Sequence, residues 1–355
     1  MTGLAGSEHI TWLSECAAAG PSLVGGKALG LGTLCALDLP VPPGFAITTS
    51  AYRRHVTDTG LLDRIVGLLA KADTIEARAE VSGQIGTLFD EAGLCEAVSG
   101  EVRAAYGGLG EGPVAVRSSA DAEDTADASF AGQQESFLWV SGSDDVVRAV
   151  ARCWASLFTP HAISYRADRD IAPQDVAMGV VVQRMVPATA AGVMMTLDPV
   201  TGDRSQIAIE ACYGLGIGVV SGEVTPDRFF VDKVTLDIRA REPMTKHGMF
   251  TYDPGSRRVR LVDVPSDQRD RPCLTDGEVR HLAGLGKRIE RDLGVPQDIE
   301  WAFGEGDQDE RELSLLQARP ETVWSKKRRP AAAAGTTAMD RLLATLRTPM
   351  KLKNQ

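Results

Sequence analysis

Val114-Ala-Val-Arg-Ser-Ser-Ala-Asp-Ala-Glu-Asp124 combines a short apolar run with an arginine and two serines at its end. The pattern predicts a strand at 114–117 that delivers Arg117, whose permanently charged planar fork suits phosphate oxygens. A surface ion pair of Arg117 with Asp121 or Glu123 is the alternative interpretation. A short loop follows, and its Gly132 would let it close over a nucleotide.

A glycine-rich segment lies upstream, Val24-Gly-Gly-Lys-Ala-Leu-Gly-Leu-Gly32, and leads into an apolar helical run. Glycines before a helix let the backbone approach an anion, and Lys27 adds a positive charge beside the helix N-terminus. The segment is not a P-loop, because the order G-x-x-x-x-G-K-[ST] is missing. Most glycine-rich turns are only turns, so this motif alone is weak evidence for a phosphate site.

A third motif ends a predicted strand at 180–185 with Gln183, Arg184, Met185 and Val186. Backbone amide and carbonyl groups between two lobes commonly read an adenine edge, and an apolar side chain such as Met185 can stack on the ring. We therefore expect the adenine-binding part of a nucleotide site here.

The fourth motif, Asp298-Ile-Glu-Trp301, faces Leu316-Gln-Ala-Arg-Pro320 across a polar loop. Carboxylate and amide oxygens are hard ligands that suit Mg²⁺, which makes Glu300 and Gln317 candidate metal ligands. A nearby arginine, Arg319, could hold phosphates that the metal bridges. A structural salt bridge between Glu300 and Arg319 is the competing account.

Composition and charge narrow the classes of protein. The chain has 355 residues, of which 43% are hydrophobic and 24% charged, and this balance is typical of a globular protein of two or three units. The net charge is −10, but residues 326–355 carry +7, so residues 1–325 carry −17. A body that acidic repels a phosphate backbone, and we expect no nucleic-acid partner.

The N-terminus has neither a basic stretch nor a sustained apolar run, and the apolar run near Val180 is interrupted by Gln183 and Arg184. These features predict no membrane association and a cytoplasmic location. The six cysteines lie far apart without a C-x-x-C pair, which favours reduced thiols over a zinc site or a disulfide framework.

Hydrophobic periodicity divides the chain into a helical N-terminal part, a strand-rich part and a tail, which is an α+β organisation. Helices are expected within 51–106, at 144–158 and at 276–293. Further strands are expected at 136–140, 193–197, 206–210, 229–238, 258–264, 298–303 and 313–318. The tail, 326–355, is interpreted as a basic linker and a short docking helix, with a frayed terminus as the alternative.

Eight motifs in this order resemble one family. They are Gly-Gly-Lys, Val-Arg-Ser-Ser, Phe-Ala-Gly-Gln, Gln-x-Met-Val, Asp-Pro-x-x-Gly, Tyr-Gly-Leu-Gly, Asp-Ile-Glu-Trp and Leu-Gln-x-Arg-Pro. Over about residues 20–325 the chain resembles the ATP-grasp nucleotide-binding domain of phosphoenolpyruvate synthase, pyruvate phosphate dikinase and rifampicin phosphotransferase. The resemblance implies two lobes, 1–190 and 191–325, with the nucleotide between them.

The resemblance implies ATP and Mg²⁺ as cofactors and gives most of the candidate residues a role. It assigns phosphate binding to Lys27 and Arg117, the adenine hinge to residues 183–186, Mg²⁺ binding to Glu300 and Gln317, and stabilisation of the transferring phosphoryl group to Arg319. Gly132 would belong to the mobile loop over the phosphates. One departure is Ile217, where the family often has Glu, so no role is assigned to that turn.

The full-length relatives pass the phosphoryl group to a histidine on a swivelling domain, in a Thr-Ser-His-x-Ala-type motif. None of the five histidines has that context, and the chain ends roughly where the relatives would continue into that domain. His161 comes closest, but it directly follows a predicted helix and is more simply a packing or surface residue. We therefore expect a separate histidine-bearing subunit to supply the relay residue.

This split organisation resembles phenylphosphate synthase and the related cresol-phosphorylating synthases. The resemblance implies that ATP gives AMP and phosphate, and that a phosphoryl group passes through the partner's histidine to a phenolic hydroxyl. Two other functions stay open at this point: a stand-alone kinase that releases ADP, and a non-catalytic nucleotide sensor.

Overall fold

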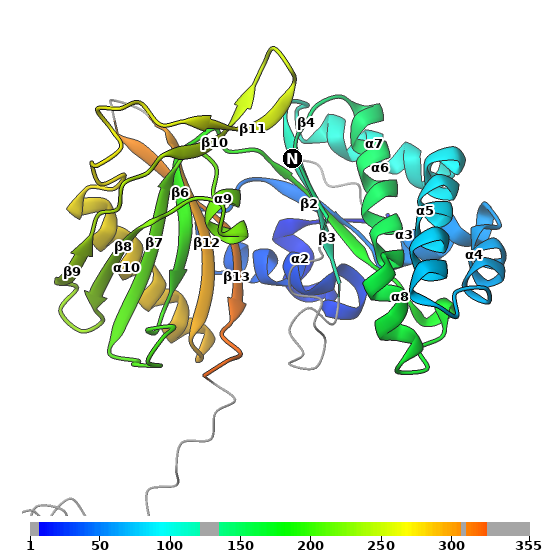
Figure 1. The fold of residues 1–355 in the computed structure, drawn as a ribbon, viewed down its shortest axis with the longest axis horizontal. Helices are drawn as coiled ribbons and strands as arrows, with labels where there is room; N and C mark the ends of the chain where they lie inside the picture. The colour runs from blue at the N-terminus through cyan, green and yellow to red at the C-terminus, as the bar shows by residue number, and fades with distance from the viewer. Residues whose placement is uncertain (1–6, 121–134, 307–309, 325–355) are drawn as a thin grey trace, which may run out of the picture. The chain divides into compact units, whose positions relative to one another are not determined.

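The computed structural model describes residues 7–120, 135–306 and 310–324. The described residues up to Glu321 belong to one compact unit, and 322–324 belong to a second one. Gly132 and the tail 326–355 lie outside the described residues, so the predictions made for them stay predictions. Within the first unit, two separate sheets each have their own core, and we call these parts the N-terminal and the C-terminal lobe (Figure 1).

The N-terminal lobe contains a five-stranded antiparallel sheet in the order β1-β2-β5-β3-β4. Its strands are β1 (Ile10–Trp12), β2 (Gly44–Ile47), β3 (Val114–Ser119), β4 (Ser136–Val140) and β5 (Gly179–Arg184). Its helices are α1 (Cys16–Ala19), α2 (Pro21–Ala36), α3 (Thr49–Asp58), α4 (Leu61–Leu69), α5 (Ile75–Ala92), α6 (Glu96–Gly108), α7 (Ser143–Ala155) and α8 (Pro160–Ala167). The core packs between the sheet and α3 to α8, around Phe45, Phe89 and Trp154.

The C-terminal lobe contains a six-stranded antiparallel sheet in the order β13-β12-β6-β7-β8-β9. Its strands are β6 (Ala188–Met195), β7 (Gln206–Tyr213), β8 (Asp227–Asp232), β9 (Ile238–Glu242), β12 (Gln297–Glu305) and β13 (Arg311–Pro320). A separate hairpin, β10 (Gly248–Asp253) and β11 (Arg258–Asp263), projects from this lobe (Figure 1). A short helix, α9 (Ile217–Ser221), follows β7.

The long helix α10 (Asp276–Leu293) covers one face of the C-terminal sheet (Figure 1). Its Val279, Leu282 and Ile289 are fully buried against the sheet, as the 3.6-residue period of a one-sided helix requires. A capping box between Thr275 and Glu278 begins the helix, and Gly294 ends it in the left-handed conformation. Helix α10 therefore leaves the opposite face of this sheet uncovered, and the cleft described below lies on that face.

The structure agrees with most of the predicted elements, including the helix at 276–293 and the strand at 136–140. One predicted strand, 229–238, is wrong because the chain turns within it and forms two strands, β8 and β9. At the turn, a carboxylate oxygen of Asp232 accepts hydrogen bonds from the backbone N–H groups of Val234 and Thr235, at 2.8 and 2.9 Å. This aspartate-centred turn contains no Gly or Pro, which are the residues that mark a turn most clearly in sequence.

His55 lies in the core of the N-terminal lobe, where it is completely buried and stacks on the Trp154 ring at 5.2 Å. Its Nδ1 accepts the backbone N–H of Cys95 at 3.3 Å. Burial lowers the pKa of His55 from 6.5 to about 4, although the nearby Asp58 acts in the opposite direction. The folded protein therefore keeps this imidazole neutral where the unfolded chain would protonate it.

We expect this histidine to make the free energy of unfolding fall as the pH decreases. Below pH 6.5 only the unfolded state binds the proton, so up to ~3 kcal/mol of stability should be lost between pH 6.5 and 4. Urea unfolding of the wild type and of His55→Phe at pH 7 and pH 5 measures the difference. A loss as steep in the variant as in the wild type would contradict the assignment, and His281→Asn on the exposed face of α10 is the control.

Candidate functional site

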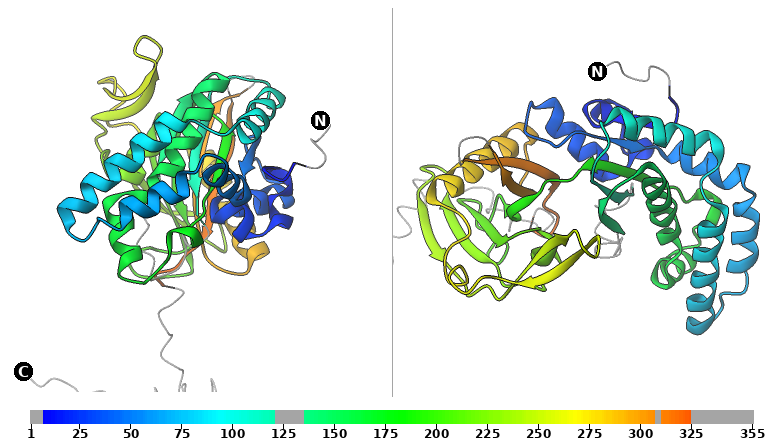
Figure 2. Two further views of the ribbon diagram at one scale, coloured as in Figure 1. Left: turned by 90° about the vertical axis from the view of Figure 1, so that its right-hand side faces the viewer. Right: turned by 90° about the horizontal axis from the view of Figure 1, so that it is seen from above.

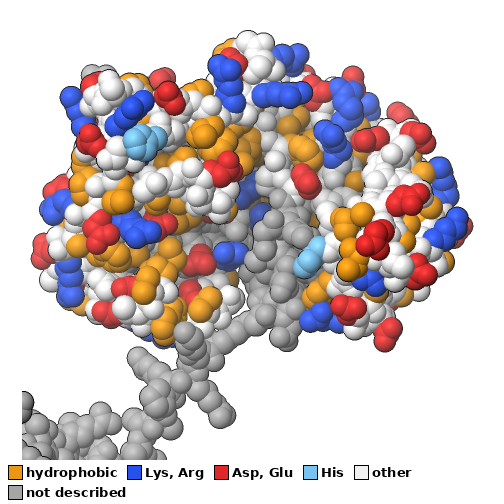
Figure 3. Space-filling view, viewed as in Figure 1, with side chains coloured by type: hydrophobic (Ala, Val, Ile, Leu, Met, Phe, Trp, Pro, Cys, Tyr) orange, Lys and Arg blue, Asp and Glu red, His pale blue; other side chains and the backbone are white. Residues whose placement is uncertain are grey.

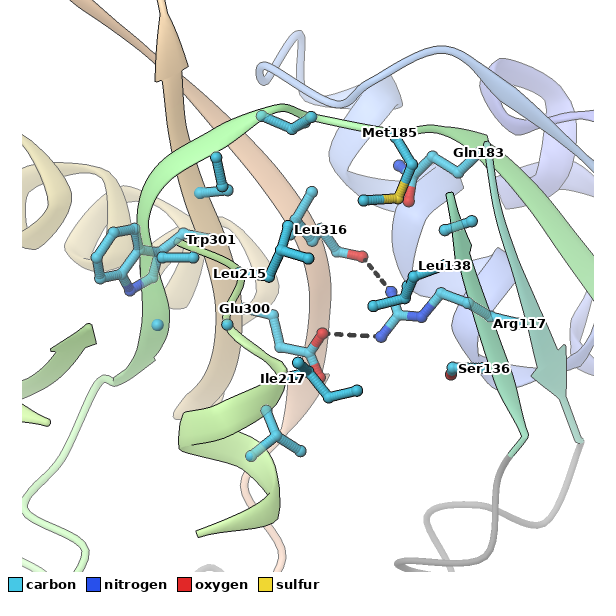
Figure 4. Close-up of a pocket in the computed structure, with 18 of the residues that line it drawn as sticks. Arg117, Ser136, Leu138, Gln183, Met185, Leu215, Ile217, Glu300, Trp301 and Leu316 are labelled. Atoms are coloured by element: carbon cyan, nitrogen blue, oxygen red, sulfur yellow. Dashed lines mark hydrogen bonds and ion pairs between the residues drawn. The ribbon is translucent and has the colours of Figure 1, made fainter. Parts of the chain in front are cut away.

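A cleft of about 160 Å³ lies between the two sheets of the compact unit (Figure 4). Its walls come from β3, β4 and β5 on one side and from β6, α9, β12 and β13 on the other. The lining is mostly apolar, with Leu138, Met185 and Leu215 among its members, while Arg117 and Glu300 bring charge to one part of it. An apolar pocket with a few polar groups is the usual form of a small-molecule site.

Arg117 connects the two lobes. It is carried by β3, and its side chain is only 13% exposed. The Nη2 atom donates to Glu300 Oε2 at 2.8 Å, and Nη1 donates to the carbonyl oxygen of Leu316 at 3.0 Å (Figure 4). Nη2 also donates to Gln317 Oε1 at 3.0 Å. The structure thus brings one predicted phosphate ligand together with both predicted metal ligands, although nearly 200 residues separate them. Asp121 and Glu123, the alternative partners of Arg117, lie outside the described residues.

The three acceptors around Arg117 depend on an irregularity in β13. Glu300 pairs with Gln317, but the next residue of β12, Trp301, pairs with Leu315, so Leu316 is an extra residue. A bulge of this kind locally redirects the strand and leaves one residue outside the regular ladder. Here the carbonyl of the extra residue accepts from Arg117. This contact could not be predicted from the residue type, because it is made by the backbone.

The proposed salt bridge between Glu300 and Arg319 is wrong. Asp298, rather than Glu300, pairs with Arg319 in the ladder, and Arg319 Nε lies 3.5 Å from Asp298 Oδ2. Side chains two residues apart on a strand share a face, so Arg319 lies beside Gln317 on the face that carries Glu300. Its side chain is 45% exposed and lies outside the lining of the cleft. Its role in stabilising a phosphoryl group stays a prediction.

Lys27 is also outside the cleft lining, and it is 6% exposed. Its Nζ donates to the backbone oxygen of Ser118 at 3.1 Å, next to Arg117 in the chain. The glycines do precede a helix, because Gly25 has non-helical angles, φ 80° and ψ 167°, and divides α2 into a short first part from Pro21 and a second helix that begins after it. Only glycine fits there, since a Cβ would lie 2.0 Å from the oxygen of Ser119.

The predicted adenine hinge follows β5 and leads directly into β6. Gln183 is buried, and its Nε2 donates to the backbone oxygen of Pro42 at 3.2 Å. The N–H of Met185 donates to the oxygen of Pro113 at 3.0 Å. Gln183, Arg184, Met185 and Val186 all line the cleft, and their role as an adenine hinge stays a prediction. Because the Met185 N–H is engaged, adenine contacts here would have to use other backbone groups of the connection.

Several cleft residues were not among the predicted site residues. Leu138 could have been predicted, because it lies two residues after Ser136 on a correctly predicted strand, and side chains two residues apart share a face. Leu215 and Ile217 line the opposite wall, and Ile217, which received no role, is 37% exposed at the start of α9. Trp301 borders the cleft, but its ring points away from Arg117 (Figure 4) and packs in the core of the C-terminal lobe.

The donor set fits Mg²⁺ bound together with a nucleotide. Within the described part of the chain, no group of three or more His, Cys, Asp and Glu side chains could hold a metal by itself. Glu300 and Gln317 are adjacent oxygen ligands, since both reach the same guanidinium nitrogen. One or two protein ligands are what Mg²⁺ usually takes when phosphates supply the others.

All five histidines belong to the described residues, and none of them lines the cleft. His9 lies 2.8 Å from Glu101, and His55 is in the core. The remaining three, His161, His247 and His281, are exposed elsewhere. Among the residues described here, no helix is long and apolar enough to span a membrane.

The fold and the cleft define a two-lobed domain with a charged end suited to phosphates and an apolar end suited to a base. Residues 21–339 match the family described as the pyruvate phosphate dikinase AMP/ATP-binding domain. The chain therefore belongs to this family of ATP-binding domains.

Three curated relatives are named as phosphoenolpyruvate synthases. The chain is 40% identical over 334 residues to a probable phosphoenolpyruvate synthase of Methanocaldococcus jannaschii. The aligned region covers 92% of this chain and 28% of that protein. It is 39% identical over 357 residues to the enzyme of Aeropyrum pernix (91% and 43%) and 40% over 356 residues to that of Pseudomonas aeruginosa (95% and 44%). The chain thus spans less than half of the length of these relatives.

Proposed function

We propose that the chain is the ATP-grasp unit of a phosphotransferase and binds ATP with Mg²⁺ in the cleft between its lobes. The observation that carries the proposal is the contact of Arg117 on one lobe with Glu300 and Gln317 on the other. Membership of an AMP/ATP-binding domain family supports the choice of nucleotide. The apolar end of the cleft, with Met185 and Leu138, would receive the adenine.

In this proposal the charged residues exchange partners when the nucleotide binds. Arg117 would donate to phosphate oxygens instead of Glu300 and Gln317, whose own oxygens would turn to the metal. Mg²⁺ supplies positive charge that neutralises the phosphate oxygens. Lys27 and Arg319 would add two further cations, provided that they reach the phosphates from their positions at the margin of the cleft.

We further propose that a histidine on a partner subunit receives the phosphoryl group. The absence of histidine from the cleft lining supports this, because a group-transfer relay needs a nucleophile at the phosphates. The β-phosphoryl group would pass to the histidine and the γ-phosphoryl group would leave as phosphate with the use of one water, which yields AMP. The histidine would then phosphorylate a small acceptor.

For the acceptor we propose a phenolic hydroxyl. Pyruvate is the second candidate, and the names of the relatives favour it. A histidine-bearing protein encoded beside this chain would be the natural partner to test.

The proposed function is tested with the purified chain, β-³²P-labelled ATP and Mg²⁺, with and without that histidine-bearing protein. We expect AMP and an acid-labile phosphohistidine only when both proteins are present, and transfer of the label to phenol when it is added. Transfer to pyruvate and not to phenol would overturn the phenolic acceptor in favour of the second candidate. Acceptor phosphorylation with release of ADP by the chain alone would show a stand-alone kinase. ATP binding without turnover in every mixture would favour a nucleotide sensor instead.

A further inference from the structure

Another contact joins the two lobes, besides those of Arg117 and the packing of α2 against β13. The ring of Trp139 on β4 stacks on the ring of Tyr252 on β10, with centroids 4.8 Å apart and planes within 12°. The hairpin β10–β11 belongs to the C-terminal lobe and reaches across to β4 of the N-terminal sheet (Figure 2). The stack is therefore a direct bridge between the lobes.

Trp139 adopts an uncommon backbone conformation to make this contact. Its φ is 62°, in the left-handed region that bulky side chains rarely enter. Val114 pairs with Val140 and Val116 pairs with Phe137, so Leu138 and Trp139 together face the single residue between them on β3. The bulge places Leu138 in the cleft lining and its neighbour Trp139 against the hairpin. Strained residues of this kind persist only where their surroundings support them.

Tyr252, the other partner of the stack, lies on a hairpin that is attached at its base to the rest of the C-terminal lobe. The N–H of Leu215 donates to the oxygen of Phe250 at 2.8 Å, and Leu215 lines the cleft. Just before β10, Lys246 forms an ion pair of 2.6 Å with Asp227, and the two side chains are 1% and 0% exposed. The hairpin is thus attached to the cleft wall and to the core of its own lobe.

Each ring belongs to an element that is connected to the cleft wall. Trp139 follows the lining residue Leu138 on β4, and Tyr252 lies on the hairpin whose Phe250 binds the lining residue Leu215. On the face shown in Figure 3, hydrophobic side chains gather over α9 and the base of this hairpin. Ile217 and Val220 of α9 also line the cleft and are 37% and 62% exposed. A movement that separated the two rings would therefore widen the cleft at its apolar walls.

We propose that Trp139 and Tyr252 are positioning residues that hold the two lobes at the spacing needed for nucleotide binding. This inference rests on the proposed function of the cleft as an ATP site. The stack fixes one side of the cleft, while the contacts of Arg117 join its charged end. Neither ring lines the cleft, so the pair acts through the distance between the walls.

The test compares Tyr252→Ala with Tyr252→Phe in the full chain, with Tyr165→Ala on α8 as a control for loss of an aromatic ring elsewhere. An aromatic pair of this kind contributes an amount that corresponds to about 3–10-fold in affinity. We expect Tyr252→Ala to raise the Kd of the chain for Mg·ATP by about that factor. In turnover assays with the histidine-bearing partner present, it should raise KM and leave kcat at saturating ATP unchanged. Tyr252→Phe and the control should behave like the wild type.

A second variant separates positioning from folding. Trp139→Gly removes the ring but suits the left-handed backbone, so it should weaken Mg·ATP binding without lowering the melting temperature. Hydrogen exchange in the ligand-free protein gives a readout that does not depend on ATP. Both ring-deletion variants should exchange faster at 136–140 and 214–217, and Tyr252→Phe should not.

The outcomes distinguish the two proposals. If the wild type binds no ATP, the proposed function fails, and unchanged exchange in the variants would overturn the bridging role as well. If the wild type binds ATP and both ring-deletion variants bind it equally well, the positioning proposal is overturned while the proposed function stands. A fall in kcat at unchanged KM would also contradict a role in spacing.

Discussion

Replacing Arg117 with alanine is expected to lower the rate of ATP turnover by about 10²–10³-fold, or ~3–4 kcal/mol of transition-state stabilisation. The side chain is 13% exposed, and its guanidinium makes three hydrogen bonds, all to the opposite lobe. In the proposed reaction the same donors would meet phosphate oxygens whose charge shifts during transfer. The measurement is the rate of ATP consumption with the histidine-bearing partner present.

Two control variants make this result specific. Arg117→Lys keeps the charge but loses the fork that serves several acceptors, so its rate should fall between those of the wild type and alanine. Arg103→Ala removes a surface arginine that pairs with Asp144 and is 42% exposed, and it should leave the rate unchanged. Circular dichroism should be nearly the same for all variants. More than half of the wild-type rate in Arg117→Ala would contradict the role of Arg117.

The second large effect is expected for Glu300→Gln, which should reduce Mg²⁺-dependent ATP consumption by about 10²-fold or more. The substitution preserves the shape of the side chain and an oxygen that can accept from Arg117, but it removes the anionic metal ligand. The fold should therefore survive. The rate is measured over a range of Mg²⁺ concentrations, and the requirement for Mg²⁺ should increase.

Glu210→Gln is a matched control for this variant. Glu210 lies on β7 of the same sheet, its side chain is 26% exposed like that of Glu300, and it pairs with Arg228 at 3.0 Å. It should keep the wild-type dependence on Mg²⁺. If Glu300 served only as the ion-pair partner of Arg117, its variant would instead lose thermal stability and keep an unchanged Mg²⁺ profile.

Local patterns were sufficient to predict most of the elements of the fold. The helix at 276–293 has a strong one-sided period and good caps, and the predicted strands at 136–140 and 206–210 lie in β4 and β7, the second of which extends to Tyr213. The split of 229–238 was missed because an aspartate side chain makes the turn. The glycines before the helix of Lys27 were recognised, but the reason that position 25 requires glycine was not, because it depends on the approach of Ser119, a residue far away in sequence.

The candidate site was predicted in its residue types more than in its contacts. Glu300 and Gln317 were expected to face each other across a hairpin, and the ladder pairs them. The error for Arg319 amounts to two residues along β12, because the antiparallel register places it opposite Asp298 instead of Glu300. The bulge at Leu316 and the bridge between Trp139 and Tyr252 depend on tertiary packing, which no pattern along one strand contains.

The central claim is that ATP binds between the lobes, with its phosphates at Arg117, Glu300 and Gln317. A crystal structure of the chain with Mg²⁺ and a non-hydrolysable ATP analogue tests it most directly. We predict the base against Met185 and Leu138, the phosphates within hydrogen-bond distance of the Arg117 guanidinium, and the metal on Glu300 and Gln317. A nucleotide bound elsewhere on the chain, with the ion pair of Arg117 and Glu300 still intact, would contradict the account.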